Sequence, residues 1–195
     1  MCIHLRNGNV VTLDGRESAP AAAHENMYAE NPSASVFGGL SIAVPGATKA
    51  MYYASQRFGR LAWARILEPL VRAACEGFEV EWSLALRISK KLSAIRARPE
   101  LAAIYLDAQG NPKREGDIIV DSKLCVTFQR IADNPTDYWE GALAKDIEAD
   151  IKENDGIVTA DDLRDYEPLW KVVKLSPYLR IYTFKRATGI TYNVW

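Results

Sequence analysis

The sequence predicts an α+β fold in which strands near both ends of the chain flank a helical middle. Residues 2–6 and 10–14 have strand character and flank Asn7-Gly8, a pair suited to a hairpin turn with positive φ at both positions. Residues 171–175 and 179–184 alternate and are rich in Val, Ile, Tyr and Phe, as strands are. Between them, apolar residues recur at helical spacing from Ala47 to Asp165.

Glycine and proline divide this middle into separate helices. Apolar residues at i, i+3, i+4 and i+7 predict a helix over 47–58, which Gly59 ends. A short helix over 63–67 is expected next, and Pro69 is expected to begin another that ends at Gly77. The spacing of Leu84, Ile88, Leu92 and Ile95 then predicts one continuous helix.

The second half of the middle follows the same logic. Pro99 fits the first turn of a short helix, and residues 110–112 form a Gly-Asn-Pro turn. Apolar spacing predicts helices over 124–131 and 143–151. Thr159 lies three residues before Asp162, the spacing of a capping box. Before the helices, turn signals around residues 40–44 predict a loop or short strand.

Composition limits the classes of function. The 195 residues carry a net charge of -1, so nothing in the bulk charge attracts nucleic acid, and no nucleic-acid partner is expected. Cys2, Cys75 and Cys125 show no CxxC spacing, which predicts thiols rather than a disulfide framework and disfavours a metal site. No stretch approaches the roughly 20 apolar residues of a membrane helix.

Familiar catalytic motifs are missing from the sequence. There is no GxSxG elbow, there are two histidines, and no phosphate-binding GxxxxGK[ST] loop is present. Gly38-Gly39 is too short for a dinucleotide fingerprint, and no pair of carboxylates is singled out by spacing. The residues therefore predict no catalytic group, no cofactor and no metal.

Arg16 is the one residue with a candidate binding role. It lies at the end of an expected strand and is followed by small residues, so its planar guanidinium has room to bind a carboxylate with two hydrogen bonds. The alternative is an ordinary surface arginine paired with Glu17 or Asp14. The residues alone leave both open and favour the surface pair.

Six ordered blocks resemble the γ-glutamyltransferase (γ-glutamyl transpeptidase) family over residues 10–183. Residues 14–20 read DGRESAP and are similar to D-x-R-E-[ST]-A-P, and residues 39–46 read GLSIAVPG and are similar to G-x-L-S-V-A-V-P-G. The other four blocks lie at 56–63, 76–80, 138–141 and 156–166. Any one block is weak, but their order makes the combination specific.

The resemblance implies part of an N-terminal-nucleophile hydrolase fold, an αββα sandwich, with residues 1–195 forming a partial large-subunit domain. It implies an enzyme that transfers the γ-glutamyl group of glutathione to water, amino acids or peptides. The N-terminal Thr of a small subunit, made by self-cleavage of the precursor, is the nucleophile. Within this chain it implies one substrate-binding residue, Arg16, which would bind the α-carboxylate of the glutamyl group.

Departures from the family pattern shape the remaining expectations. The Gly-rich lead-in to the first hairpin and the nucleophilic Thr are not found, and residues 184–195 do not match, so the chain is expected to be inactive by itself. A non-enzymatic degenerate paralogue and a fragment of a related acylase of the same fold are the alternatives. The resemblance implies the extracellular face of the plasma membrane, although no targeting signal or anchor is found in the sequence.

Overall fold

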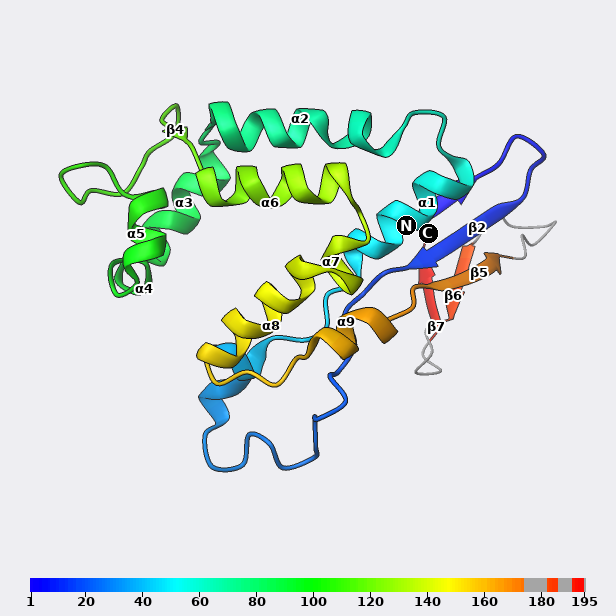
Figure 1. The fold of residues 1–195 in the computed structure, drawn as a ribbon, viewed down its shortest axis with the longest axis horizontal. Coiled ribbons are helices and arrows are strands. Elements are labelled where there is room, and N and C mark those ends of the chain that lie inside the picture. The colour runs from blue at the N-terminus through cyan, green and yellow to red at the C-terminus, as the bar shows by residue number, and fades with distance from the viewer. Residues whose placement is uncertain (174–181, 186–190, 195) are drawn as a thin grey trace. The chain divides into compact units, whose positions relative to one another are not determined.

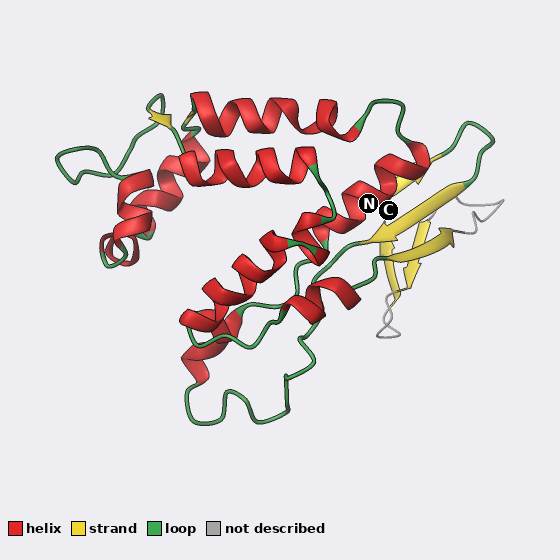
Figure 2. Cartoon of the chain, in the orientation of Figure 1, coloured by secondary structure: helices red, strands yellow, loops and turns green. Residues whose placement is uncertain are grey.

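The structure, a computed structural model, describes residues 1–173, 182–185 and 191–194. The chain divides into two compact units, residues 1–60 with 136–195 and residues 61–135. Helices account for most of the regular structure in the described residues (Figure 2). Each unit is described by itself below.

A three-stranded antiparallel sheet begins the first unit, in the order β1-β2-β5. β1 (Cys2–His4) pairs with β2 (Val10–Asp14), and β2 pairs with β5 (Leu169–Val173), which comes from the far end of the chain. β2 is the central strand and is buried along most of its length. A separate antiparallel pair joins β6 (Tyr182–Lys185) and β7 (Thr191–Val194).

The hairpin between β1 and β2 confirms the prediction but not its turn type. Gly8 has a φ of 84°, whereas Asn7 does not have positive φ. The Gly8 N–H donates to the Leu5 carbonyl, and the Leu5 N–H donates to the Asn9 carbonyl. This is the three-residue loop in which glycine follows a tight turn in the left-handed region. The Asn7 side chain accepts the Asn9 N–H at 3.0 Å, which fixes Asn7 in its place.

One helix covers the sheet and others build a second core. α1 (Ala47–Phe58) ends at Gly59 as predicted and lies next to β2 (Figure 1). It packs Ala50 and Ala54 against Leu13 of β2. α7 (Asp137–Glu140), α8 (Ala142–Glu153) and α9 (Ala160–Asp165) follow later in the chain. Their apolar faces meet in one cluster, which contains Val44, Trp139, Ala144, Ile151, Val158 and Leu163.

The loop before α1 has little regular structure. It holds two 3-10 turns, η1 (Pro32–Ser35) and η2 (Gly39–Ser41). Val44 forms a single antiparallel bridge with Ser18, so the short strand considered for this region is reduced to one pair.

The second unit is a small helical domain with two short strands. α2 (Trp63–Glu76) and α6 (Ser122–Asp133) lie side by side (Figure 1). Between them come β3 (Phe78–Glu79), α3 (Trp82–Lys90), α4 (Leu92–Arg96), α5 (Pro99–Tyr105) and β4 (Ile118–Ile119). Val80, Ile88, Ile95 and Ile119 form its core.

Two expectations for the second unit are wrong, and one pair of strands was missed. Pro69 lies inside α2 rather than at the start of a new helix, because Leu67 and Ala74 on either side of it are both buried and keep the helix together. The helix expected over 84–95 breaks at Lys91, whose φ of -109° and ψ of 14° are not helical. The β3-β4 pair was missed, since strands of two residues show no period.

The prediction of unpaired thiols is also wrong for two of the three cysteines. Cys75 and Cys125 form a disulfide, and their Cα atoms are 4.9 Å apart. The antiparallel packing of α2 on α6 brings them together, an effect of tertiary structure that spacing along the chain does not reveal. At the other end of the same pair of helices, the Trp63 indole N–H donates to the Ile131 carbonyl at 2.9 Å. Cys2 is free and exposed.

Several other expectations are confirmed. α5 begins at Pro99 and α6 ends before Asn134. The turn expected at residues 110–112 lies at 107–111 instead, where the Gly110 N–H donates to the Asp107 carbonyl, and Pro112 forms a bridge with Leu106. The second strand of the expected C-terminal pair is β6, whereas residues 174–175 and 179–181 of the predicted strands lie outside the described residues.

We predict that removing the disulfide destabilises the second unit. The bridge closes a sequence separation of 50 residues, for which chain-entropy reasoning gives about 4 kcal/mol. The Cys75→Ala/Cys125→Ala double variant should therefore unfold at clearly lower temperature and urea concentration than the parent. Cys2→Ser is the matched control and should leave the transition unchanged, because Cys2 is exposed.

Thiol titration of the denatured chain provides an independent check. One reactive thiol is expected before reduction and three after it, because the sequence has three cysteines and two of them are bridged. Three thiols before reduction would contradict the disulfide.

Candidate functional site

Arg16 lies just beyond the end of β2 and exposes its guanidinium. Its backbone N–H donates to Asp14 Oδ1 at 3.1 Å, so Asp14 holds the main chain of Arg16. Its Nη2 donates to Glu17 Oε1 at 2.8 Å, and the two side chains are 67% and 50% exposed. The surface pair with Glu17 that the sequence allowed is therefore present. An exposed ion pair of this kind contributes at most about 1 kcal/mol to stability, so another carboxylate can readily replace Glu17.

The main chain around this arginine is held at several points, in contrast to its side chain. We call residues 14–21 the Arg16 segment. The Tyr166 hydroxyl donates to the Arg16 carbonyl at 2.7 Å. Ser18 and Val44 exchange backbone hydrogen bonds of 3.2 and 2.9 Å, and the Ala21 N–H donates to Asp162 Oδ1 at 2.8 Å. The segment thus presents an exposed guanidinium, paired with Glu17, on a backbone held at several points.

Asp162 links this segment to the start of α9. Its Oδ2 accepts the backbone N–H and the hydroxyl of Thr159, both at 2.9 Å, while its Oδ1 accepts Ala21. The predicted capping box between Thr159 and Asp162 is confirmed. Partial burial acts to raise the pKa of Asp162, but the hydrogen bonds from Ala21 and Thr159 outweigh it and lower that pKa.

Two glycines allow the segment to lie directly on its supports. A Cβ added to Gly15 would collide with the Cβ of Ala50 on α1, and one added to Gly46 would collide with the ring of Tyr166. The end of β2 therefore lies against α1, and the Tyr166 ring lies against the first turn of the same helix. Larger residues at either position would move the backbone next to Arg16.

A buried lysine fixes the chain between α9 and β5. Lys49 is 3% exposed, and its Nζ donates to the carbonyls of Arg164 at 2.8 Å and Tyr166 at 2.6 Å. The same atom lies 3.0 Å from Glu167 Oε1 and 5.6 Å from the Trp139 ring centroid. These partners offset the desolvation of the ammonium group.

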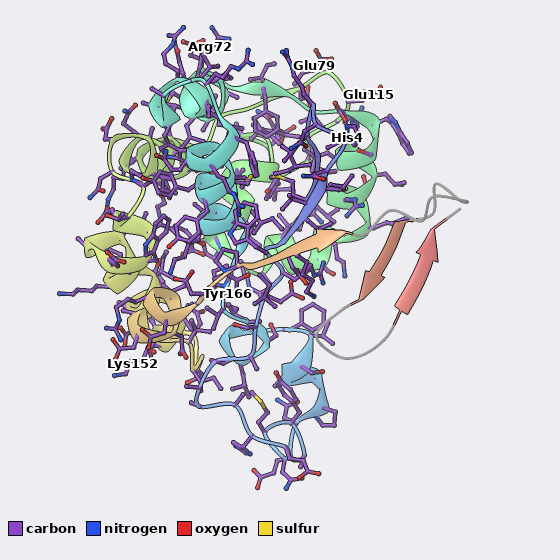
Figure 3. All side chains as sticks on the ribbon, turned by 90° about the vertical axis from the view of Figure 1, so that its right-hand side faces the viewer. His4, Arg72, Glu79, Glu115, Lys152 and Tyr166 are labelled. Atoms are coloured by element: carbon purple, nitrogen blue, oxygen red, sulfur yellow. A yellow bond between two sulfur atoms is a disulfide. The ribbon has the colours of Figure 1, made fainter. Side chains whose placement is uncertain are left out.

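Tyr166 is held both at its backbone carbonyl, by Lys49, and at its hydroxyl, by the Arg16 carbonyl. It follows α9 and precedes β5, where Figure 3 labels it. Burial raises the pKa of its hydroxyl, and the negative charges of Asp14, Glu17 and Glu167 raise it further. The hydroxyl is therefore protonated at neutral pH and available as a donor to Arg16.

Sequence reasoning found only one of these residues as a functional candidate. The structure brings Arg16 together with Tyr166 and Asp162, which lie about 150 positions further along the chain. Tyr166 and Asp162 fell within one of the six blocks, but no spacing rule assigned them to Arg16. Nothing in the sequence singled out Lys49.

The described residues offer no candidate metal site and no membrane-spanning helix. Within them, no three His, Cys, Asp or Glu side chains gather as a metal site would require. None of the helices there has the length and apolarity needed to cross a membrane.

Comparison with solved structures defines the class of protein. The chain matches the crystal structure of Helicobacter pylori gamma-glutamyltranspeptidase with a TM-score of 0.82 and 26% identity, over 99% of this chain and 54% of that one. The chain therefore carries part of an N-terminal-nucleophile hydrolase fold, and the predicted α+β class is confirmed.

Comparison of sequences identifies the family. The gamma-glutamyltranspeptidase family model matches residues 1–188, and the chain belongs to this family of enzymes. The match includes residues 184–188, which the sequence analysis had placed outside the resemblance.

Curated relatives show how much of such a protein is present. Scoloptoxin SSD14 from Scolopendra dehaani is 42% identical over 88% of this chain and 30% of its own length. Glutathione hydrolase 2 from Arabidopsis thaliana is 34% identical over 84% of this chain and 28% of its own length. The chain thus spans about 30% of the length of the curated relatives it matches.

We predict that Asp162→Asn loosens the Arg16 segment and α9 at neutral pH. One carboxylate oxygen becomes an amide NH₂, and either Ala21 or Thr159 then faces a donor instead of an acceptor. Urea unfolding near pH 7 should show a loss of about 1 kcal/mol. Asp161→Asn is the matched control and should have little effect, because Asp161 makes an exposed pair with Arg164.

The difference between parent and Asp162→Asn should depend on pH. The folded pKa of Asp162 is lowered, so its contribution is complete above the unfolded value of about 3.9 and is lost as pH falls through the folded pKa. The unfolding curves of the two proteins should therefore converge as the pH falls through that lowered pKa. A difference that stays constant as the pH is lowered would contradict the assignment.

Proposed function

We propose that this chain is the part of a γ-glutamyltransferase, or glutathione hydrolase, that binds the α-carboxylate of the γ-glutamyl substrate through Arg16. The observation that carries the proposal is the geometry of the Arg16 segment, in which an exposed guanidinium rises from a backbone held by Tyr166 and Asp162. Membership of the family and the name glutathione hydrolase 2 on a relative at 34% identity support the reaction.

The chemistry of a two-donor arginine supports this role. A guanidinium offers parallel N–H groups that match the two oxygens of a carboxylate. The pair with Glu17 is exposed and weak, so a substrate carboxylate that brings its own binding energy displaces it at little cost. The anchored backbone around Arg16 supports the role, because it restricts the positions that the guanidinium can take.

In the proposed reaction the γ-glutamyl group passes to an enzyme nucleophile and then to water, an amino acid or a peptide. Arg16 holds the α-carboxylate end of the glutamyl group, so that the γ-amide carbonyl is presented at a fixed distance from it. Membership of the family implies that the nucleophile is the N-terminal Thr of a small subunit. In this proposal, residues 1–195 form a partial large-subunit domain. Two-step acyl transfer of this kind uses the Thr amine as the base for its own hydroxyl.

We propose an extracellular location, or another oxidising compartment, for the protein. The Cys75–Cys125 bridge supports it, because disulfides persist outside the cytosol and are rare inside it. Labelling of intact cells with a membrane-impermeant reagent tests the location. Recovery of the protein only after lysis, with Cys75 and Cys125 reduced, would overturn it.

We predict that Arg16→Ala impairs only substrates that carry the α-carboxylate. The assay uses a hybrid in which residues 1–188 replace the matching segment of Arabidopsis glutathione hydrolase 2. Two substrates are compared, a γ-glutamyl anilide and the 4-aminobutanoyl anilide, which lacks the α-carboxylate. Loss of a charged hydrogen-bonded pair should lower kcat/KM for the first by about tenfold to a hundredfold and leave the second unchanged.

Two further variants sharpen the result. Arg16→Lys keeps the charge but loses the two-donor geometry, so it should also raise KM. Arg65→Ala removes another exposed, paired arginine and is the matched control, which should leave both substrates unaffected. Equal loss on both anilides would contradict carboxylate binding, and a wild-type KM for Arg16→Ala would remove the assignment. A well-folded hybrid without activity would favour the non-enzymatic or acylase alternatives.

A further inference from the structure

Tyr166 is the side chain that contacts the main chain of Arg16 from a distant part of the sequence. Its hydroxyl donates to the Arg16 carbonyl at 2.7 Å across a sequence separation of 150 residues. The Ser18–Val44 bridge and the Ala21–Asp162 bond anchor the same segment two and five residues further along. Of these three contacts, the bond from Tyr166 is the one that acts on the carbonyl of Arg16 itself.

We infer that Tyr166 is a positioning residue for Arg16, which sets the direction of the guanidinium towards a substrate α-carboxylate by fixing the Arg16 carbonyl. This inference rests on the proposed function of Arg16. It assigns no contact between Tyr166 and the substrate. The effect of Tyr166 passes entirely through the backbone of the arginine.

The surroundings of Tyr166 suit such a role because they leave its ring little freedom. The ring lies against Gly46, where a Cβ would collide with it. The carbonyl of Tyr166 is also held, because the buried Nζ of Lys49 donates to it at 2.6 Å. Moving the Tyr166 backbone would break this bond. Short hydrogen bonds thus connect Lys49 to the Tyr166 carbonyl and the Tyr166 hydroxyl to the Arg16 carbonyl.

A rigid donor matters here because Arg16 has a long and exposed side chain. A small rotation of its peptide unit moves the guanidinium, several bonds away, by much more than the carbonyl. Asp14 restrains the same residue at its N–H, at 3.1 Å. Together, Asp14 and Tyr166 hold the two ends of the residue that bears the binding group, as a pre-organised site requires.

The decisive experiment is Tyr166→Phe in the hybrid enzyme, measured with the same two anilides. Phenylalanine keeps the ring and removes the one donor, so KM for the γ-glutamyl anilide should rise about three- to tenfold, the effect of one neutral hydrogen bond. Values of kcat should change little, and the 4-aminobutanoyl anilide should be unaffected. In an Arg16→Ala background the substitution should have no further effect, because the group that it positions is gone.

Tyr28→Phe is the matched control. The Tyr28 hydroxyl also donates to a main-chain carbonyl, that of Leu40 at 3.1 Å, in the same unit of the chain. It should lower stability to a similar degree without changing KM for either substrate. If Tyr166→Phe and Tyr28→Phe behave alike in both respects, Tyr166 has a structural role only and the inference is overturned.

The outcomes separate this inference from the proposed function. A wild-type KM for Tyr166→Phe together with a raised KM for Arg16→Ala overturns the inference and leaves the function standing. A wild-type KM for Arg16→Ala overturns both. A well-folded but inactive hybrid overturns the proposed function and, with it, this inference.

Discussion

The buried ammonium group of Lys49 is the interaction on which the candidate site depends. A charge at 3% exposure is tolerated only when polar partners replace its water, and here two backbone carbonyls and the carboxylate of Glu167 do so. Arg164 lies in the last turn of α9, and Tyr166 and Glu167 lie in the connection between α9 and β5. α1, which carries Lys49, is thereby tied to that connection, and Tyr166 is placed beside the end of β2.

The pairing of β5 with β2 positions the same part of the chain independently of Lys49. β5 pairs with β2 along five residues, and Asp14 pairs with Leu169 at the end where Arg16 follows. The sheet register and the Lys49 bonds therefore agree on where residues 166–169 lie. The two restraints are independent, and both hold the residues that contact the Arg16 segment, which itself has no regular secondary structure beyond the Ser18–Val44 bridge.

Local patterns predicted the parts of this arrangement that depend on neighbouring residues. The helix of 47–58 has a clear apolar face and a glycine stop, and the Thr159–Asp162 box has its own spacing rule. Long-range partners were beyond such rules. Neither the Cys75–Cys125 bridge nor the bond from Tyr166 to Arg16 leaves a mark in the spacing of nearby residues, because both result from packing between distant segments. Pro69 shows the same limit, since burial on both sides of it kept α2 intact.

The proposed binding of a carboxylate by Arg16 is supported by comparing the free energies of two ion pairs, the one with Glu17 and the one with a substrate carboxylate. In the structure the guanidinium donates to Glu17, an adjacent and half-exposed residue, and such a pair contributes at most about 1 kcal/mol. A charged hydrogen bond to a bound substrate, held in place by the rest of that substrate, contributes about 1.5–3 kcal/mol. The exchange therefore favours the substrate. Because the backbone is already fixed by Tyr166 and Asp14, little further ordering is needed when the carboxylate binds.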